Sequence, residues 1–339
     1  MRALSDSPVV RPLILFLILS GLVCPAGRSV AAQQPGVALP VSAEAGGQKT
    51  GSVLLFGFFG SSATSPGANN TNIAISNMSS SGGVTLQLGF VNGASGENHS
   101  SFLCLTANQT VRFNASDYAP GTAGYLYVAA IDRATGCPVS FNHLAGEANV
   151  KMSATQQFGY KAMAVAALYN GLLPGWTAAD GAAQLRFDGV AYNRLPRGLV
   201  ADRLRGPGAG NSMTLILTGI GGNLTQNSAA TLGAVNGALV DQTRATYSFS
   251  FTQNRPQMVS ALSDTFPQIS PPLSTLIPPG QGGWLQLQPD ADRALIGFLV
   301  TANPGVASAA TAYNGGHALH ALSVASSVSL TIPVIQSPC

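Results

Sequence analysis

Two stretches of this chain, residues 52–150 and 212–335, are built from short strand-like segments separated by turn residues. Within the first stretch, residues 84–91 alternate between apolar and polar side chains and end at Asn92-Gly93, a pair that favours tight turns. About seven such segments follow one another at intervals of roughly 8–12 residues, a spacing typical of sandwiches. We therefore predict an all-β fold of two tandem antiparallel β-sandwich (Ig-like) domains. The expected core includes the alternating residues Ile73, Ile75, Leu86 and Leu88.

The two stretches also look like copies of one unit, as expected for an internal duplication. In each stretch a Pro-Gly turn precedes an aromatic residue that lies in a strand-like run, Tyr125 in the first and Trp284 in the second. The alternative is coincidental similarity among glycine-rich strands. The matched segments are 213–220 with 53–59, 245–251 with 84–90, 276–287 with 118–128, and 295–300 with 139–144.

Composition between the copies predicts the domain boundaries. Residues 193–211 contain Pro196, Pro207 and several glycines, which is typical of a linker. Residues 161–168 could form a short helix by propensity, but we predict a strand. The predicted plan is a signal peptide at 1–32, an N-terminal linker at 33–51, a first sandwich with its extension at 52–192, a linker at 193–211 and a second sandwich at 212–339.

The N-terminal region has the features of a secretory signal. Arg2 and Arg11 precede an uncharged apolar run at 12–24, which is shorter than the roughly 20 residues that a membrane span needs. Residues 30–32 are small, as a signal peptidase requires. We predict secretion to the periplasm or the exterior, with no transmembrane segment after cleavage. The alternatives are a retained anchor and a lipoprotein modified at Cys24.

Charge argues against a nucleic-acid partner. Charged residues make up only 9% of the chain, and removing the predicted signal leaves 13 basic and 12 acidic residues. A nucleic-acid-binding protein normally shows a basic patch or stripe. The only local cluster is arginine-rich and falls in the predicted linker, where we interpret it as solvated in preference to an anion site. Its members are Arg194, Arg197, Arg203 and Arg205.

Three cysteines remain after the predicted cleavage: Cys104, Cys137 and Cys339. In an oxidising compartment two of them are expected to pair. Cys104 and Cys137 both fall in the first stretch, so we predict a disulfide between them. Closing this loop of about 34 residues would stabilise the fold by roughly 3–4 kcal/mol in the chain-entropy model. Cys339 is then the odd cysteine, either free or cross-linked to another chain.

Candidate catalytic and metal-binding residues are few. His317 and His320 have a spacing that suits a metal on a helix, but on a strand residues three apart point to opposite faces. No Gly-x-Ser-x-Gly motif is present. The remaining candidates, Asp290 and Asp292 for calcium and Asp117, Asp132 and Glu147 for glycoside hydrolysis, are explained more simply by turn and surface chemistry. We predict no catalytic residue, cofactor or metal.

Four longer segments are distinctive enough to compare with known families: 103–110, 136–142, 187–197 and 331–339. Together they resemble a group of secreted bacterial proteins with tandem β-sandwich domains and no assigned activity. The resemblance covers most of the mature chain. It implies a bacterial exported protein and transfers no catalytic residue.

These observations predict a secreted, non-enzymatic structural or binding protein of the bacterial cell envelope or exterior. Its expected partner is a cell-surface glycan or an envelope protein, since duplicated sandwiches present loops and edges for binding. The alternative is a secreted hydrolase acting on glycans, with carboxylates brought together at the domain junction. A cleft with converging titratable groups would distinguish the two.

Overall fold

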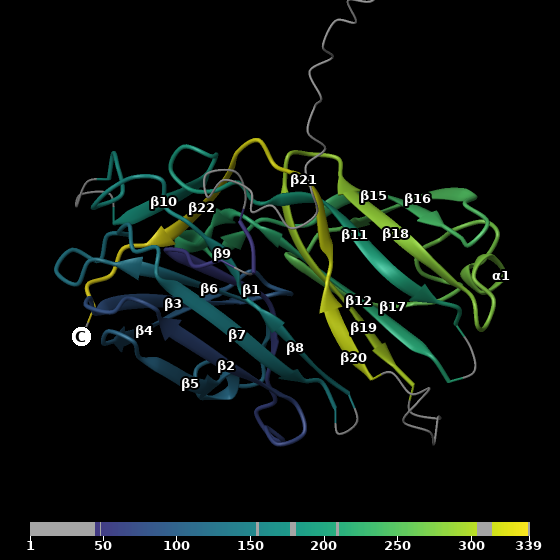
Figure 1. Ribbon diagram of the computed structural model, residues 1–339, viewed down its shortest axis with the longest axis horizontal. Coiled ribbons are helices and arrows are strands. Elements are labelled where there is room, and N and C mark those ends of the chain that lie inside the picture. Colours follow the sequence, from purple (N-terminus) through teal and green to yellow (C-terminus); the bar gives the residue numbers. More distant parts are fainter. Residues whose placement is uncertain are drawn as a thin grey trace, which may run out of the picture. The chain divides into compact units, whose positions relative to one another are not determined.

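The computed structural model describes residues 45–47, 49–153, 156–176, 181–207, 210–303 and 314–337 (Figure 1). The predicted signal peptide and the alternative modification site at Cys24 lie outside these residues. The described residues all belong to one compact unit. No helix among the described residues is long and apolar enough to cross a membrane.

The described chain is almost entirely β-strand, and its strands fall into two halves. The first half comprises β1 (Val53–Gly60), β2 (Asn70–Asn77), β3 (Val84–Asn92), β4 (Asn98–Leu105), β5 (Thr110–Asn114), β6 (Ala123–Ile131), β7 (Leu144–Lys151), β8 (Gln157–Lys161) and β9 (Met163–Val165). The second half comprises β11 (Pro196–Arg205), β12 (Ser212–Ile220), β15 (Gly233–Val240), β16 (Thr246–Gln253), β17 (Gln257–Leu262), β18 (Gly282–Pro289), β19 (Ala294–Ala302), β20 (Gly315–Ala318) and β21 (His320–Val324).

Four further strands and three short helices complete the described elements. The strands are β10 (Ala182–Phe187), β13 (Gly222–Asn223), β14 (Ser228–Ala229) and β22 (Val328–Pro333), and the helices are η1 (Ala115–Asp117), η3 (Leu224–Gln226) and α1 (Leu273–Leu276).

The two halves have the same strand topology. In the first, a sheet of order β4-β3-β6-β1-β9 accompanies a sheet of order β5-β2-β7-β8. In the second, β16-β15-β18-β11-β21 accompanies β17-β12-β19-β20. Each strand of one half has a counterpart in the other, from β1 and β11 through to β9 and β21. Neighbouring strands in these four sheets are antiparallel, so the prediction of an all-β fold of antiparallel sheets is confirmed.

A β-bulge recurs at the same place in both halves. In β1, Gly57 and Phe58 lie opposite the single residue Tyr125 of β6. In β11, Asp202 and Arg203 lie opposite Trp284 of β18. A bulge of this kind bends the strand and redirects its side chains. Gly57 and Asp202 thus occupy equivalent positions, although one carries no side chain and the other a carboxylate.

Alternating side chains build the core as the sequence predicts. Ile73, Ile75, Leu86 and Leu88 are all fully buried. All eight residues of β1 are buried, which agrees with its uninterrupted apolar sequence. Residues 161–168 contain the end of β8 and all of β9, so the predicted strand, and not the alternative helix, is formed there.

The internal repeat is correct in kind but shifted by one strand in places. The predicted match of residues 213–220 with 53–59 is wrong by one strand, because β12 corresponds to β2 and the counterpart of β1 is β11. Likewise β16 corresponds to β4, not to β3. The match of 276–287 with 118–128 is the correct one, since it equates β18 with β6. Apolar β-strands resemble one another closely enough that their order in a sheet cannot be assigned from composition.

The predicted linker at 193–211 is wrong, because ten of its residues form β11, which lies between β18 and β21. The halves are also joined at their ends, where β10 pairs antiparallel with the C-terminal strand β22. Buried residues of β10 and β22 lie opposite each other in the pairs Ala183–Ile332, Leu185–Leu330 and Phe187–Val328. The predicted N-terminal linker is partly structured too, since Gly46 forms an antiparallel bridge with Ala164 of β9.

Candidate functional site

The outer side of the sheet β5-β2-β7-β8 presents an ordered array of polar side chains, which we call the polar face. Alternation along each strand places apolar residues such as Ile73 and Val150 in the core and their neighbours on this outer side. The members of the polar face are Asn72, Ala74, Ser76, Thr110, Arg112, Asn114, Glu147, Asn149, Gln157 and Lys161.

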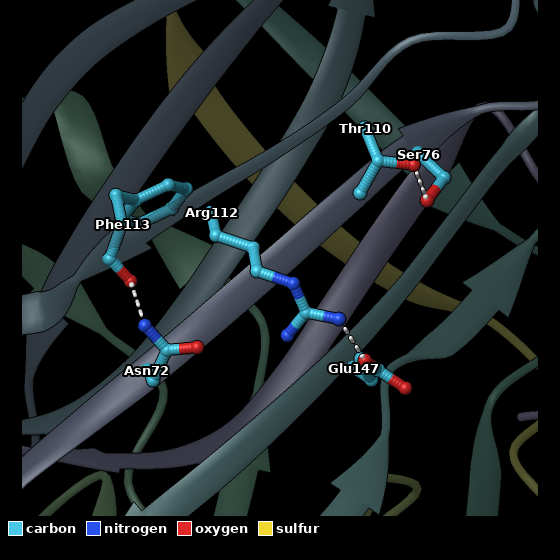
Figure 2. Close-up of polar contacts among 6 residues, drawn as sticks. All are labelled: Asn72, Ser76, Thr110, Arg112, Phe113 and Glu147. Atoms are coloured by element: carbon cyan, nitrogen blue, oxygen red, sulfur yellow. Dashed lines mark hydrogen bonds and ion pairs between the residues drawn. The ribbon is translucent and has the colours of Figure 1, made fainter.

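A charged row crosses the middle of the polar face. Strand register places Arg112, Ala74, Glu147 and Lys161 side by side on four neighbouring strands. The small side chain of Ala74 lets Arg112 reach across β2, and its Nη2 lies 3.0 Å from Oε1 of Glu147 (Figure 2). About half of each side chain in this ion pair is exposed. Such a pair contributes less than about 1 kcal/mol to stability.

Amide and hydroxyl groups form the flanking rows. Asn114, Asn72 and Asn149 are aligned next to the charged row, and Nδ2 of Asn72 donates to Oδ1 of Asn114 at 3.2 Å. On the other side, the hydroxyls of Ser76 and Thr110 lie 2.8 Å apart (Figure 2). These groups can both donate and accept hydrogen bonds, so the surface can match a ligand rich in hydroxyl groups.

Two depressions hollow the polar face and its margins. One, of about 670 Å³, is lined by Ser76, Thr110, Arg112, Glu147 and Lys161 among others. The second, of about 850 Å³, is lined by residues that include Asn70, Asn72, Asn114, Asn149 and Gln157. Their charged lining residues are four cations and two anions, namely Lys49, Arg112, Lys151 and Lys161 against Asp117 and Glu147.

A second polar cluster lies where β11 meets β20 and β21. Nε2 of His317 lies 3.1 Å from Oδ1 of Asp202, and Nε2 of His320 lies 3.4 Å from the same oxygen. Our expectation that the two histidines point to opposite faces is wrong. The chain leaves one sheet after Ala318 and enters the other at His320, so strand alternation does not extend across the pair.

The environment of this cluster lowers the pKa of His317. Desolvation is the main cause, and the charges of His320 and Arg203 act in the same direction, while Asp202 opposes them. Both histidines also line a cavity of about 590 Å³ that includes Tyr160 and Phe298. Among the described residues, no group of three or more His, Cys, Asp or Glu side chains is arranged to hold a metal ion.

The acidic residues considered for calcium binding or hydrolysis make local contacts. Asp292 accepts hydrogen bonds from the backbone N–H groups of Ser326 and Ser327, and Asp290 accepts one from Asn236. These bonds hold loops together.

Asp117 and Asp132 are bound in a similar way. Asp117 caps η1 through the N–H of Asn114. A hydrogen bond from the Thr135 hydroxyl lowers the pKa of Asp132. Glu147 is the third acidic candidate, and it belongs to the polar face.

The arginines of the predicted linker are also engaged locally. Arg194 donates to the carbonyl of Asp188, and Arg197 donates to the carbonyls of Pro289 and Asp290. Three of the four, including Arg197, lie on β11, so this segment is a strand and not a linker, although Arg203 and Arg205 are exposed on it as expected.

The predicted disulfide between Cys104 and Cys137 is not formed, because Cys137 is a free and fully buried cysteine. Register explains this. Cys104 pairs with Thr85, Thr85 with Ile131, and Ile131 with Pro138. Cys104 is therefore three strand spacings, about 14 Å, from Pro138, the residue next to Cys137. Bridged cysteines have Cα atoms less than about 7 Å apart.

Cys104 is itself disulfide-bonded, and Cys137, the other cysteine among the described residues, is free. Cys339, which we expected to be free or cross-linked to another chain, lies outside the described residues. Burial raises the pKa of the Cys137 thiol, which keeps it protonated and unreactive.

Sequence reasoning identified the strands of the polar face but not the face itself. The alternation in residues 70–77 and 110–114 shows which side chains point outward. It does not show that these segments are neighbours, or that β7 places Glu147 opposite Arg112. No family model, curated protein or solved structure matches the chain.

Proposed function

We propose that this protein is an exported, non-enzymatic binding protein that holds a cell-surface glycan on its polar face. The observation that carries the proposal is the register of the outward side chains on β5, β2, β7 and β8. It produces adjacent rows of amide, charged and hydroxyl groups over a surface that is hollowed along its length. Sugars present closely spaced hydroxyl groups that such rows can bind.

Charge narrows the class of glycan. The excess of cations over anions around the two depressions favours a polysaccharide that carries carboxylate or other anionic groups. Arg112 can turn from Glu147 toward a ligand carboxylate at little cost, because an exposed ion pair is weak. Export to the periplasm or the exterior, and the resemblance to secreted bacterial proteins, are consistent with this partner.

The strand order supports an immunoglobulin-like core as part of this proposal. Strands β1, β6 and β3 are neighbours in one sheet, and β2, β7 and β8 are neighbours in the other. The same relation between chain order and sheet order characterises the immunoglobulin fold. On this interpretation β4, β5 and β9 are additions, and the two halves are tandem copies that share one compact unit.

The hydrolase alternative has less support. It requires two carboxyl groups roughly 5–10 Å apart across a bound sugar. The cavity lined by residues of both halves contains His317, His320 and Lys161, and none of its described lining residues is Asp or Glu.

The proposal is tested by binding of the mature protein to a panel of neutral and anionic polysaccharides, measured by calorimetry. We expect binding to an anionic member, weakened at least tenfold by Arg112→Ala and reduced by salt. The matched control is Arg255→Ala, which removes the same charge from an exposed position outside the polar face. Equal effects of the two variants, or cleavage of the polysaccharide, would overturn the proposal.

A further inference from the structure

Cys104 lies on the outer face of the sheet β4-β3-β6. Directly opposite residues on neighbouring antiparallel strands share a face. Thr85 is the partner of Cys104, and Gln87, two residues along β3, points to the same side. Leu86 and Leu88 occupy the other side, in the core. The sulfur of Cys104 is therefore directed away from the core of the first half.

The C-terminal end of the chain runs over this same outer face. Nε2 of Gln87 donates to the carbonyl of Pro333 at 3.0 Å, where β22 ends. Further on, Nε2 of Gln336 donates to the carbonyl of Ala134 at 2.9 Å. Figure 1 shows this yellow segment leaving β22 toward the ends of β3 and β4. The described chain thus approaches the end of the sheet at which Cys104 lies.

Only two cysteines can be the partner of Cys104 within the chain. The sequence has four cysteines, and Cys137 is free. Of the remaining two, Cys24 falls in the predicted signal peptide. We propose that Cys104 is bonded to Cys339, so that a disulfide fastens the C-terminus of the second half to the outer face of the first. This proposal does not depend on the proposed glycan-binding function.

The reach of the chain is sufficient. Cys339 follows Gln336 by three residues, which span up to about 10 Å when extended. Ile131, next to the loop that binds Gln336, is two strand spacings, about 10 Å, from Cys104. Between them lies a hollow of about 440 Å³ lined by Thr85, Cys104 and Ile131 among others, which can receive the last two residues.

The bond forms by oxidation of two thiols. Each thiol loses its proton, and the two electrons pass to a disulfide oxidant by exchange through a mixed disulfide, leaving that oxidant as a dithiol. An oxidising compartment outside the cytoplasm supplies such oxidants. Cys137 does not compete, because its thiol is enclosed beside Leu173 and Pro138.

Peptide mapping without reduction tests the proposal directly. The purified protein is unfolded in the presence of an alkylating reagent and digested with trypsin. The three cysteines then fall on separate peptides, 50–112, 134–151 and 294–339. We expect 50–112 to be linked to 294–339 within one chain, and 134–151 to be alkylated at Cys137. A link between 50–112 and 134–151, an alkylated Cys104, or a dimer that dissociates on reduction would overturn the proposal.

Variants show whether the bond stabilises the fold. Cys104→Ala and Cys339→Ala should each lower Tm by roughly 5–8 °C, as expected for removing a cross-link that closes a very long loop. The double variant should be no less stable than either single one, since both remove the same bond. Cys137→Ala is the matched control and should leave the link between 50–112 and 294–339 intact. Additive losses in the double variant would contradict a shared bond.

Discussion

Two sheets that correspond in topology present opposite kinds of outer surface in the two halves of this molecule. In the first half, the outer side of β5-β2-β7-β8 is polar and open to solvent. In the second half, the corresponding sheet β17-β12-β19-β20 turns an apolar outer side toward the first half. Its outer residues belong to the core of the first half, while its inner residues form a separate core. The outer residues include Ile216, Ile296, Phe298 and Val300.

Packing at this covered side is aromatic. The ring centroid of Phe298 lies 4.4 Å from the ring centroid of Tyr160 and 5.9 Å from that of Phe158, and both of these residues lie on β8 of the first half. Gly57 permits the approach, because a Cβ atom there would lie 2.4 Å from Cγ2 of Ile296. The comparison shows that two sheets of the same topology can differ in surface, since the sheet of the second half joins the two halves and the sheet of the first half keeps a polar, exposed outer side.

The largest effect is expected from removing the aromatic contact on the covered side. Phe298→Ala should lower the free energy of unfolding by about 3–5 kcal/mol, since the side chain is 1% exposed and its loss leaves a cavity. Denaturant unfolding followed by fluorescence measures this. Thr252→Ala, at an exposed position on β16, is the control and should change stability by less than about 0.5 kcal/mol. A similarly small loss for Phe298→Ala would show that the halves do not depend on this contact.

A smaller loss is expected from a buried polar link between the halves. Nε2 of Gln257 donates to the carbonyls of Gly57 and Gly124 and to the hydroxyl of Thr218, which itself donates to Gly57. Gln257→Leu leaves buried carbonyl oxygens without this donor and should cost about 2–3 kcal/mol.

A double-mutant cycle with Thr218→Val sharpens this prediction. The two side chains share one network, so their combined loss should be less than the sum of the single losses by at least about 0.5 kcal/mol. Strict additivity would mean that Gln257 and Thr218 act independently. Chemical denaturation of the four proteins under identical conditions provides the comparison.

Much of this architecture can be predicted from local sequence patterns. Alternation correctly places Ile73 and Leu86 in the core, and the Pro-Gly turns before Tyr125 and Trp284 correctly equate β6 with β18. A strand's own sequence determines which of its side chains face inward, because the pleat has a period of two.

Local patterns do not predict which strands are neighbours in a sheet, because strand pairing depends on contacts between segments that are distant in the sequence. Composition makes residues 193–211 look like a linker, yet β11 is held between β18 and β21. Proximity in sequence favours a Cys104–Cys137 bond, yet two strands intervene. The polar face depends in the same way on register, because Arg112 and Glu147 are 35 residues apart.

The β-bulge that β1 and β11 share leads to a third prediction. At this bulge the first half has Gly57, whereas the second half has Asp202, which contacts His317 and His320. The pKa of His317 is lowered in the folded state, so the unfolded chain binds more protons at mildly acidic pH. The free energy of unfolding should therefore fall as pH is lowered through the histidine range below about 6.5, with a slope of at most about 1.4 kcal/mol per pH unit. His317→Gln should remove this slope. The variant should not change the separate fall in the free energy of unfolding below about pH 4. That fall follows from the lowered pKa of Asp132 in the folded state, since its carboxylate becomes protonated there.

The smallest change in stability is expected on the polar face itself. Arg112→Ala breaks an ion pair whose side chains are about half exposed, so the free energy of unfolding should change by less than about 1 kcal/mol. The same variant should weaken polysaccharide binding at least tenfold, as proposed above. Glu147→Gln separates the two roles of Arg112, because it frees the guanidinium and removes a negative charge from the face. We expect it to preserve or strengthen binding of an anionic polysaccharide, and a calorimetric titration that shows weaker binding would mean that Glu147 contacts the ligand itself.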